Sequence, residues 1–165
     1  MKGYKTLDYG LINQYGFKYE LNKEYHLNGE LDWTKNGFYF CDKPESTLRY
    51  AEDKNNCLIT EIEAIGKIIC CDDTFENLSQ GVEGIYASDT MIIKRIISRE
   101  ELIEMVYNSN NIDRAKTLNM YLKLTSEEIE FLLEKFKEPL IPYIEYYQYN
   151  DKDAFNVYYK LKKRG

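Results

Sequence analysis

The spacing of the apolar residues changes once along this chain, near Ser98, and this change constrains the fold more than any other feature. Before Ser98, short alternating or continuous apolar runs are bounded by glycine, asparagine and aspartate, which is typical of β-strands. After it, apolar residues recur three and four positions apart, which indicates amphipathic helices. We therefore expect an α+β chain, with a mainly antiparallel sheet and one helix in residues 1–98, followed by a helical subdomain in residues 99–165.

Short apolar segments predict the strands of the N-terminal part. Asn28-Gly29 is expected to form a tight turn, because both residues tolerate positive φ. Gly66 is expected to interrupt an alternating run, and residues 72–84, with Asp72-Asp73, are expected to form a loop. The predicted strands are residues 2–7, 16–20, 24–27, 37–41, 57–64, 67–71 and 90–97.

One stretch, residues 36–51, joins a strand to a helix. Residues 37–41 are aromatic and apolar, which suits a strand that is covered on both faces. Asp42 is expected to cap the helix that follows, with Pro44 near its first position and Glu45 at the capping-box spacing. The rest of the N-terminal part is expected to be arranged around this unit.

Capping-box sequences predict two of the helices in the C-terminal part. Ser98-Arg-Glu-Glu101 and Thr125-Ser-Glu-Glu128 place a hydroxyl three residues before a glutamate, directly ahead of apolar residues at helical spacing. Pro139 and Pro142 are expected to end the helix that begins after Thr125. Further helices are predicted over residues 112–123, 144–149 and 151–161.

Composition limits the class of protein. With 44% hydrophobic residues in 165, the chain can bury a globular core. No apolar run approaches the roughly 20 residues of a membrane-spanning helix, and the N-terminus lacks the apolar segment of a signal peptide. Four cysteines without a Cys-x-x-Cys pair, and His26 as the sole histidine, predict buried thiols and no metal site. We expect a cytoplasmic protein without a membrane partner.

Charge and tyrosine content bear on the partners. A formal net charge of −6 argues against direct binding to duplex nucleic acid, which requires a dense basic surface. An acidic surface is compatible with binding a basic protein surface, although solubility explains it equally well. The 16 tyrosines are unusual. Tyrosine is enriched in protein interfaces, and the alternative explanation is the codon bias of an AT-rich genome.

Gly37-Phe-Tyr39-Phe, followed by Thr47 and Tyr50-Ala51, resembles the middle motif of ADP-ribosyltransferases of the diphtheria-toxin and poly-ADP-ribose-polymerase type. The resemblance implies that Tyr39 and Tyr50 sandwich the nicotinamide of NAD and that the Thr47 hydroxyl holds its carboxamide. A flat ring that carries an amide is suited to two aromatic faces and a hydroxyl partner.

The same resemblance assigns two further positions. The family begins with a His-Gly pair on its first strand, and Lys2-Gly3 stands in the comparable place, so only Gly3 carries over to the cofactor site. The family's catalytic glutamate lies at the start of a late strand, where this chain offers Asp89. The resemblance therefore implies Asp89 as the candidate catalytic residue and Gly3, Tyr39, Thr47 and Tyr50 as the candidate NAD-binding residues.

The layout from Lys2-Gly3-Tyr4 to the strand Lys94-Arg95-Ile-Ile is similar to that of small uncharacterised proteins of phages and mobile elements. Together with the acidity, the tyrosine content and the lack of a catalytic constellation, this resemblance favours a cofactor-independent accessory protein that binds and occludes a host protein or ribonucleoprotein complex, such as an anti-CRISPR factor. The alternative is a mono-ADP-ribosyltransferase that uses NAD, active or degenerate. The aromatic residues of the stretch 36–51 can also be simple core. A nucleophilic enzyme that pairs His26 with a cysteine lacks any local motif.

Overall fold

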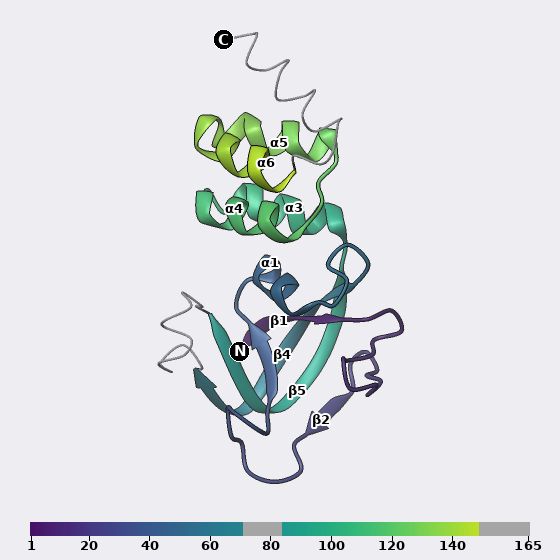
Figure 1. Cartoon of the computed structure of the whole chain (residues 1–165). Coiled ribbons are helices and arrows are strands. Elements are labelled where there is room, and N and C mark those ends of the chain that lie inside the picture. The colour runs from purple at the N-terminus through teal and green to yellow at the C-terminus, as the bar shows by residue number, and fades with distance from the viewer. Residues whose placement is uncertain (71–83, 149–165) are drawn as a thin grey trace. The chain divides into compact units, whose positions relative to one another are not determined.

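A computed structural model describes residues 1–70 and 84–148 of the chain. The chain divides into two compact units, Met1–Ser98 and Arg99–Gly165. The first contains the strands and the second contains a series of helices (Figure 1). Each unit is described separately below.

The first unit is an antiparallel sheet that closes on itself. Its strands are β1 (Lys2–Leu7), β2 (Glu24–His26), β3 (Phe38–Cys41), β4 (Leu58–Cys70) and β5 (Ile85–Ile97). Their order is β2-β5-β3-β1-β4, and β4 also pairs with β5 along most of its length (Figure 1). A short helix, α1 (Pro44–Thr47), and a 3₁₀ helix, η1 (Leu48–Tyr50), follow β3. The predicted α+β class with an antiparallel sheet is confirmed.

Pairing of β1 with both β3 and β4 brings distant segments together. Gly3 lies opposite Ile62 of β4, and Tyr4 lies opposite Cys41 of β3. A Cβ atom added at Gly3 would lie 2.2 Å from Cδ2 of Phe40, so the ring of Phe40 occupies the space that a side chain at position 3 would need. The core of this unit is apolar and almost fully buried, and it comprises Leu7, Tyr19, Phe40, Ile62, Ala64, Met91 and Ile93.

The strand predicted over residues 16–20 is wrong. The side chain of Asn13 accepts hydrogen bonds from the backbone amides of Tyr15 and Phe17, each at 2.9 Å, which fixes a turn there. Gly16 has a φ of +82°, and only an isolated bridge joins Ile12 to Lys18. The strand β2 that follows pairs with β5.

Gly66 does not interrupt the strand in which it lies. The two predicted strands 57–64 and 67–71 are one strand, β4, with a register shift between Ile65 and Ile68. Gly66 has a φ of +74° within this irregularity, so it permits a β-bulge where a break was expected. Likewise, β5 begins at Ile85, earlier than the predicted residue 90.

Asp42 does not cap helix α1. The residue that precedes the helix is Lys43, and no side chain caps the N-terminus. Asp42 instead continues the sheet, since its backbone amide donates to the carbonyl of Gly84 at 2.9 Å. Pro44 is at the first helical position, as predicted, because its fixed φ suits a helix start.

The second unit is helical, as predicted. Its elements are α3 (Arg99–Asn108), α4 (Ile112–Tyr121), α5 (Ser126–Phe136), η2 (Glu138–Leu140) and α6 (Ile141–Tyr147). The capping box at Thr125 is confirmed, with both reciprocal hydrogen bonds to Glu128 present. The apolar face of α5 is buried, as its spacing predicts, at Ile129, Leu132, Leu133 and Phe136. The helix predicted over residues 151–161 and the loop with Asp72-Asp73 lie outside the described residues.

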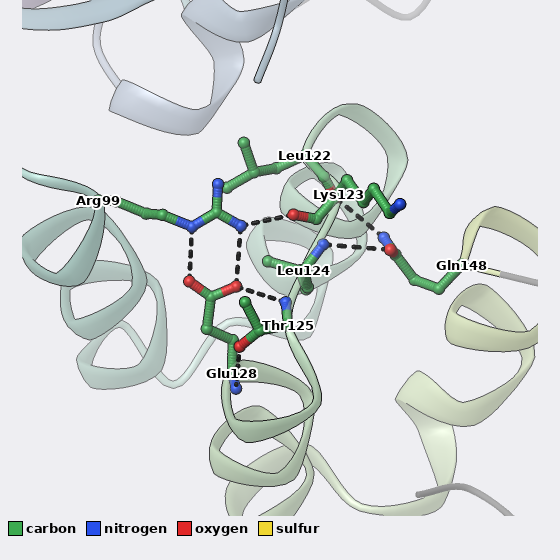
Figure 2. A network of polar contacts seen from close by, with 7 residues as sticks. All are labelled: Arg99, Leu122, Lys123, Leu124, Thr125, Glu128 and Gln148. Carbon is green, nitrogen blue, oxygen red and sulfur yellow. Dashed lines mark hydrogen bonds and ion pairs between the residues drawn. The ribbon is translucent and has the colours of Figure 1, made fainter. Parts of the chain in front are cut away.

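A polar network holds the connection between α4 and α5 (Figure 2). Arg99 donates to both carboxylate oxygens of Glu128, at 2.6 and 2.8 Å, and also to the carbonyl of Lys123. Burial raises the pKa of Glu128, but the hydrogen bonds from Arg99 and from the Thr125 amide outweigh it, so that the pKa lies below its usual value. Gln148 accepts from the amide of Leu124 at 3.1 Å.

The helices were also compared with the requirements for crossing a membrane. None of the helices within residues 1–70 and 84–148 combines the length and the apolar character that crossing a bilayer requires.

Candidate functional site

The first unit contains a cavity of about 1040 Å³. Its lining comes from β1, from β2 and the segments before and after it, from β3, from the end of α1 with η1 and the residues just after it, and from the first residue of β5. Many of the lining side chains are aromatic, among them Tyr15, Phe17, Tyr25, Trp33, Tyr39 and Tyr50. Concave sites lined by aromatic groups, with a few polar groups, are typical of ligand and partner sites.

Part of the aromatic lining is a packed cluster. The rings of Phe17, Tyr19 and Tyr25 contact one another edge to face, with centroids 4.8 to 5.7 Å apart. The hydroxyl of Tyr25 accepts a hydrogen bond from the backbone amide of Glu20 at 2.8 Å, which fixes this ring. Burial raises the pKa of Tyr19. This wall of the cavity is therefore preorganised by side-chain contacts.

Three aromatic side chains at the cavity, including Phe17 of the packed cluster, are exposed. Tyr15 is 84% exposed, Tyr50 is 53% exposed and Phe17 is 49% exposed. Large apolar surfaces in contact with water, next to a hollow, are characteristic of interaction sites. Tyr9 is also 61% exposed, but it does not contribute to the lining of the cavity.

Three of the predicted NAD-site residues, Tyr39, Thr47 and Tyr50, line this one cavity. Tyr39 is half-buried on β3, and its hydroxyl donates to the carbonyl of Asp32 at 3.4 Å. Thr47 is the last residue of α1 and is 2% exposed, and its hydroxyl donates to the carbonyl of Pro44 at 2.7 Å. The hydroxyl hydrogen of Thr47 is thus used within the helix, whereas its oxygen retains acceptor capacity.

The other two predicted residues do not line the cavity. Gly3 is buried against the ring of Phe40, where the absence of a side chain permits close packing. Asp89 lies on β5 beside Gly66 of the β4 bulge, and its carboxylate accepts from the backbone amide of Lys67 at 3.1 Å. These contacts give Gly3 a packing role and Asp89 a role in stabilising the bulge.

Lys5 is a cavity residue that the sequence analysis did not identify. It lies on β1, is half-buried, and its ammonium group donates to the backbone carbonyl of Tyr39 at 2.8 Å. Among the described residues, no carboxylate forms an ion pair with Lys5. Burial lowers the pKa of Lys5 to about 8. The electrostatic effect of the nearby Cys41 acts in the opposite direction and is the smaller of the two. The alternation of side chains along a strand places Lys5 on the same face as Leu7, which is buried. This pattern in the sequence could have indicated that Lys5 is buried as well.

Replacing Lys5 with methionine should stabilise the protein. Between pH 8 and 10.5 the unfolded state binds more protons than the folded state, so the stability of the wild type should rise with pH across that window. At pH 7, Lys5→Met removes a buried charge, and we expect a gain of about 1 kcal/mol or more, or about 4 °C in melting temperature. Thermal unfolding at pH 7 and pH 10 measures both effects.

The wild type and the Lys5→Met variant should approach each other in stability as the pH rises, because only the wild type loses a buried charge. Lys35→Met, at an exposed lysine of the same cavity, is the matched control and should show no such convergence. A variant that is less stable than the wild type at pH 7 would contradict this account of Lys5.

The next side chains to consider are those that could bind a metal ion or act as a nucleophile. Within residues 1–70 and 84–148, no group of three or more His, Cys, Asp or Glu side chains is arranged to hold a metal ion. His26 lines the cavity, and its ring contacts the Thr90 hydroxyl at 3.3 Å and a Glu24 carboxylate oxygen at 3.0 Å. Cys41 is buried, as predicted, whereas Cys57 is half-buried and Cys70 is exposed, so the prediction of buried thiols is wrong for these two cysteines.

Comparison with known proteins adds one finding. A family model described as "Domain of unknown function (DUF7666)" matches residues 1–77, which is somewhat less than half of the 165 residues. The matched range includes Lys5, Tyr39, Thr47 and Tyr50, and it stops before Asp89. No curated protein and no solved structure matches the chain.

Proposed function

We propose that this chain is a small accessory protein of the phage type that acts by binding a host protein, and that the cavity of the first unit is its binding site. The target class that we propose is a component of a host defence system. The observation that carries this proposal is the cavity with exposed Tyr15, Phe17 and Tyr50 at its lining. Rigid aromatic side chains in a partly desolvated hollow supply most of the binding energy in many protein interfaces.

Charge and the position of Asp89 support binding over catalysis. The net charge of −6 favours contact with a basic protein surface. Asp89, the counterpart of the catalytic glutamate in the family that the sequence resembles, is held at the β4 bulge outside the cavity lining. A carboxylate that is fixed there does not stabilise charge on a substrate in the cavity.

Affinity capture from host lysate tests the proposal, because the tyrosines provide a matched pair of variants. Tyr15→Ser and Tyr50→Ser remove exposed rings at the cavity, whereas Tyr9→Ser removes an exposed ring elsewhere. We expect the wild type and Tyr9→Ser to retain the same stoichiometric partner, and each cavity variant to lose at least about tenfold in affinity. Equal retention by all four proteins would count against the proposal.

A second candidate function is NAD-dependent mono-ADP-ribosyl transfer. The specific observation in its favour is that Tyr39, Thr47 and Tyr50, which carry the resemblance to that family, line the same cavity. In this alternative the two rings would hold the nicotinamide and Asp89 would have to move to reach the ribose.

Thermal unfolding in the presence of NAD tests this candidate. A ligand at 100 times its dissociation constant should stabilise the protein by about 2.7 kcal/mol. If the cavity binds NAD, Tyr50→Ala should abolish the shift, while Tyr9→Ala should preserve it. An unchanged melting temperature at millimolar NAD would rule the candidate out.

A further inference from the structure

Lys5 places a positive charge on the wall of an otherwise aromatic cavity. An ammonium group has three N–H donors, and the structure gives one of them a partner, the carbonyl of Tyr39 at 2.8 Å. A buried charge is costly unless it is paired, and no ion pair to Lys5 is present among residues 1–70 and 84–148. Within the described part of the chain, the ammonium group of Lys5 therefore has donors to spare. An anionic acceptor on a bound molecule would suit these donors.

We propose that Lys5 is the anchoring cation for a carboxylate group on the molecule that the cavity binds, with the aromatic side chains around it holding an apolar or aromatic group attached to that carboxylate. This inference deepens the proposed function, since it specifies the chemistry that the cavity recognises. The carboxylate would complete the hydrogen bonding of the ammonium group in a partly desolvated site, where charge-assisted hydrogen bonds are strong.

The position of Lys5 supports this assignment over a purely structural role. Its neighbours on β1 pair with both β3 and β4, so the backbone is rigid, and the ammonium group is further fixed by Tyr39. Lys35 lines the same cavity but is exposed, and its charge is solvated. A lysine whose charge served the stability of the fold would lose stability when replaced by an apolar residue of similar length. Lys5→Met is expected to gain stability, so the charge of Lys5 serves another purpose.

Benzoate and benzamide provide a probe pair with the same ring and a different charge. Titration of the full chain with each compound, followed by ligand-observed NMR at pH 7, measures the preference for the carboxylate. We expect benzoate to bind about tenfold more tightly than benzamide. In Lys5→Met this preference should disappear, while Lys18→Met, at an exposed lysine of the same unit outside the cavity lining, should change it by less than about twofold. Equal binding of the two compounds by the wild type, absence of benzoate binding, or an unchanged preference in Lys5→Met would overturn the proposal.

A second pair of probes distinguishes the source of the carboxylate. N-acetyl-Ala-Phe as the free acid imitates the C-terminus of a protein partner, and its C-terminal amide is the neutral control. Tighter binding of the dipeptide acid than of benzoate, lost in Lys5→Met, would assign the carboxylate to a protein partner. The reverse order, also lost in Lys5→Met, would assign it to a small aromatic acid. Either result supports the carboxylate site, and the capture experiment with the tyrosine variants tests the proposed function separately.

Discussion

Gly3→Ala should destabilise the first unit by about 3 kcal/mol, although it adds a single methyl group. The new Cβ would lie 2.2 Å from Cδ2 of Phe40 and 3.1 Å from the carbonyl oxygen of Cys41. Phe40 is 3% exposed and its ring stacks on Tyr86 with centroids 5.6 Å apart, so the ring has little room to move. Denaturant unfolding followed by the fluorescence of Trp33, the single tryptophan of the chain and a residue of this unit, measures the effect.

A double variant shows whether the clash with Phe40 is the cause. Phe40→Leu removes the ring, so Gly3→Ala/Phe40→Leu should be less destabilised than the sum of the two single variants by at least about 1 kcal/mol. Strict additivity of the two single changes would contradict the packing role that we assign to Gly3. A wild-type midpoint for Gly3→Ala would contradict it as well.

Gln148→Leu should destabilise the helical unit by about 3 kcal/mol. The Gln148 side chain is 4% exposed and makes three hydrogen bonds to backbone groups of α4 and of the α4–α5 connection. It accepts from the amide of Leu124 at 3.1 Å and donates to the carbonyl of Leu122 at 2.9 Å (Figure 2). It also donates to the carbonyl of Asn119 at 3.0 Å. Leucine fills a similar volume but leaves all three backbone groups without these partners in a buried setting.

The far-ultraviolet circular dichroism at 222 nm follows the helical unit, and the Trp33 fluorescence follows the other. In Gln148→Leu the dichroism transition should move to lower denaturant while the fluorescence transition stays in place. Hydrogen exchange of the Leu124 amide should accelerate by the corresponding factor of about 100. Glu145→Ala, at an exposed position of α6, the helix that ends just before Gln148, is the control and should leave both transitions unchanged. A Leu124 amide that exchanges at the wild-type rate would contradict the role of Gln148.

Local patterns were sufficient to predict much of the fold. The helix that opens with the capping box at Thr125 depends on interactions between residues close in the sequence. The first strand and the order of strands before helices could be predicted because the spacing of apolar residues is itself a local pattern. The errors concern features that distant residues decide. Gly66 lies in a β-bulge because β5 pairs with β4 on both sides of it. The strand β5 begins earlier than predicted because its first residues pair with β3.

The candidate site was only partly predictable for the same reason. The motif around Tyr39, Thr47 and Tyr50 spans twelve residues, so its members lie together at one cavity. Lys5 is brought to Tyr39 by strand pairing across 34 residues, and its burial depends on that contact. Asp89 was chosen by its place in a resemblance, whereas the β4 bulge determines where its carboxylate points.

The central claim of this account, that the aromatic cavity of the first unit contacts a host protein, is tested most directly by site-specific photocrosslinking. A benzophenone-bearing phenylalanine at position 15 or 50 reports contacts at the cavity, and the same residue at position 9 reports an exposed tyrosine site outside its lining. We predict that positions 15 and 50 yield the same crosslinked partner from host lysate and that position 9 does not. Crosslinking from position 9 alone, or from none of the three, would contradict the claim.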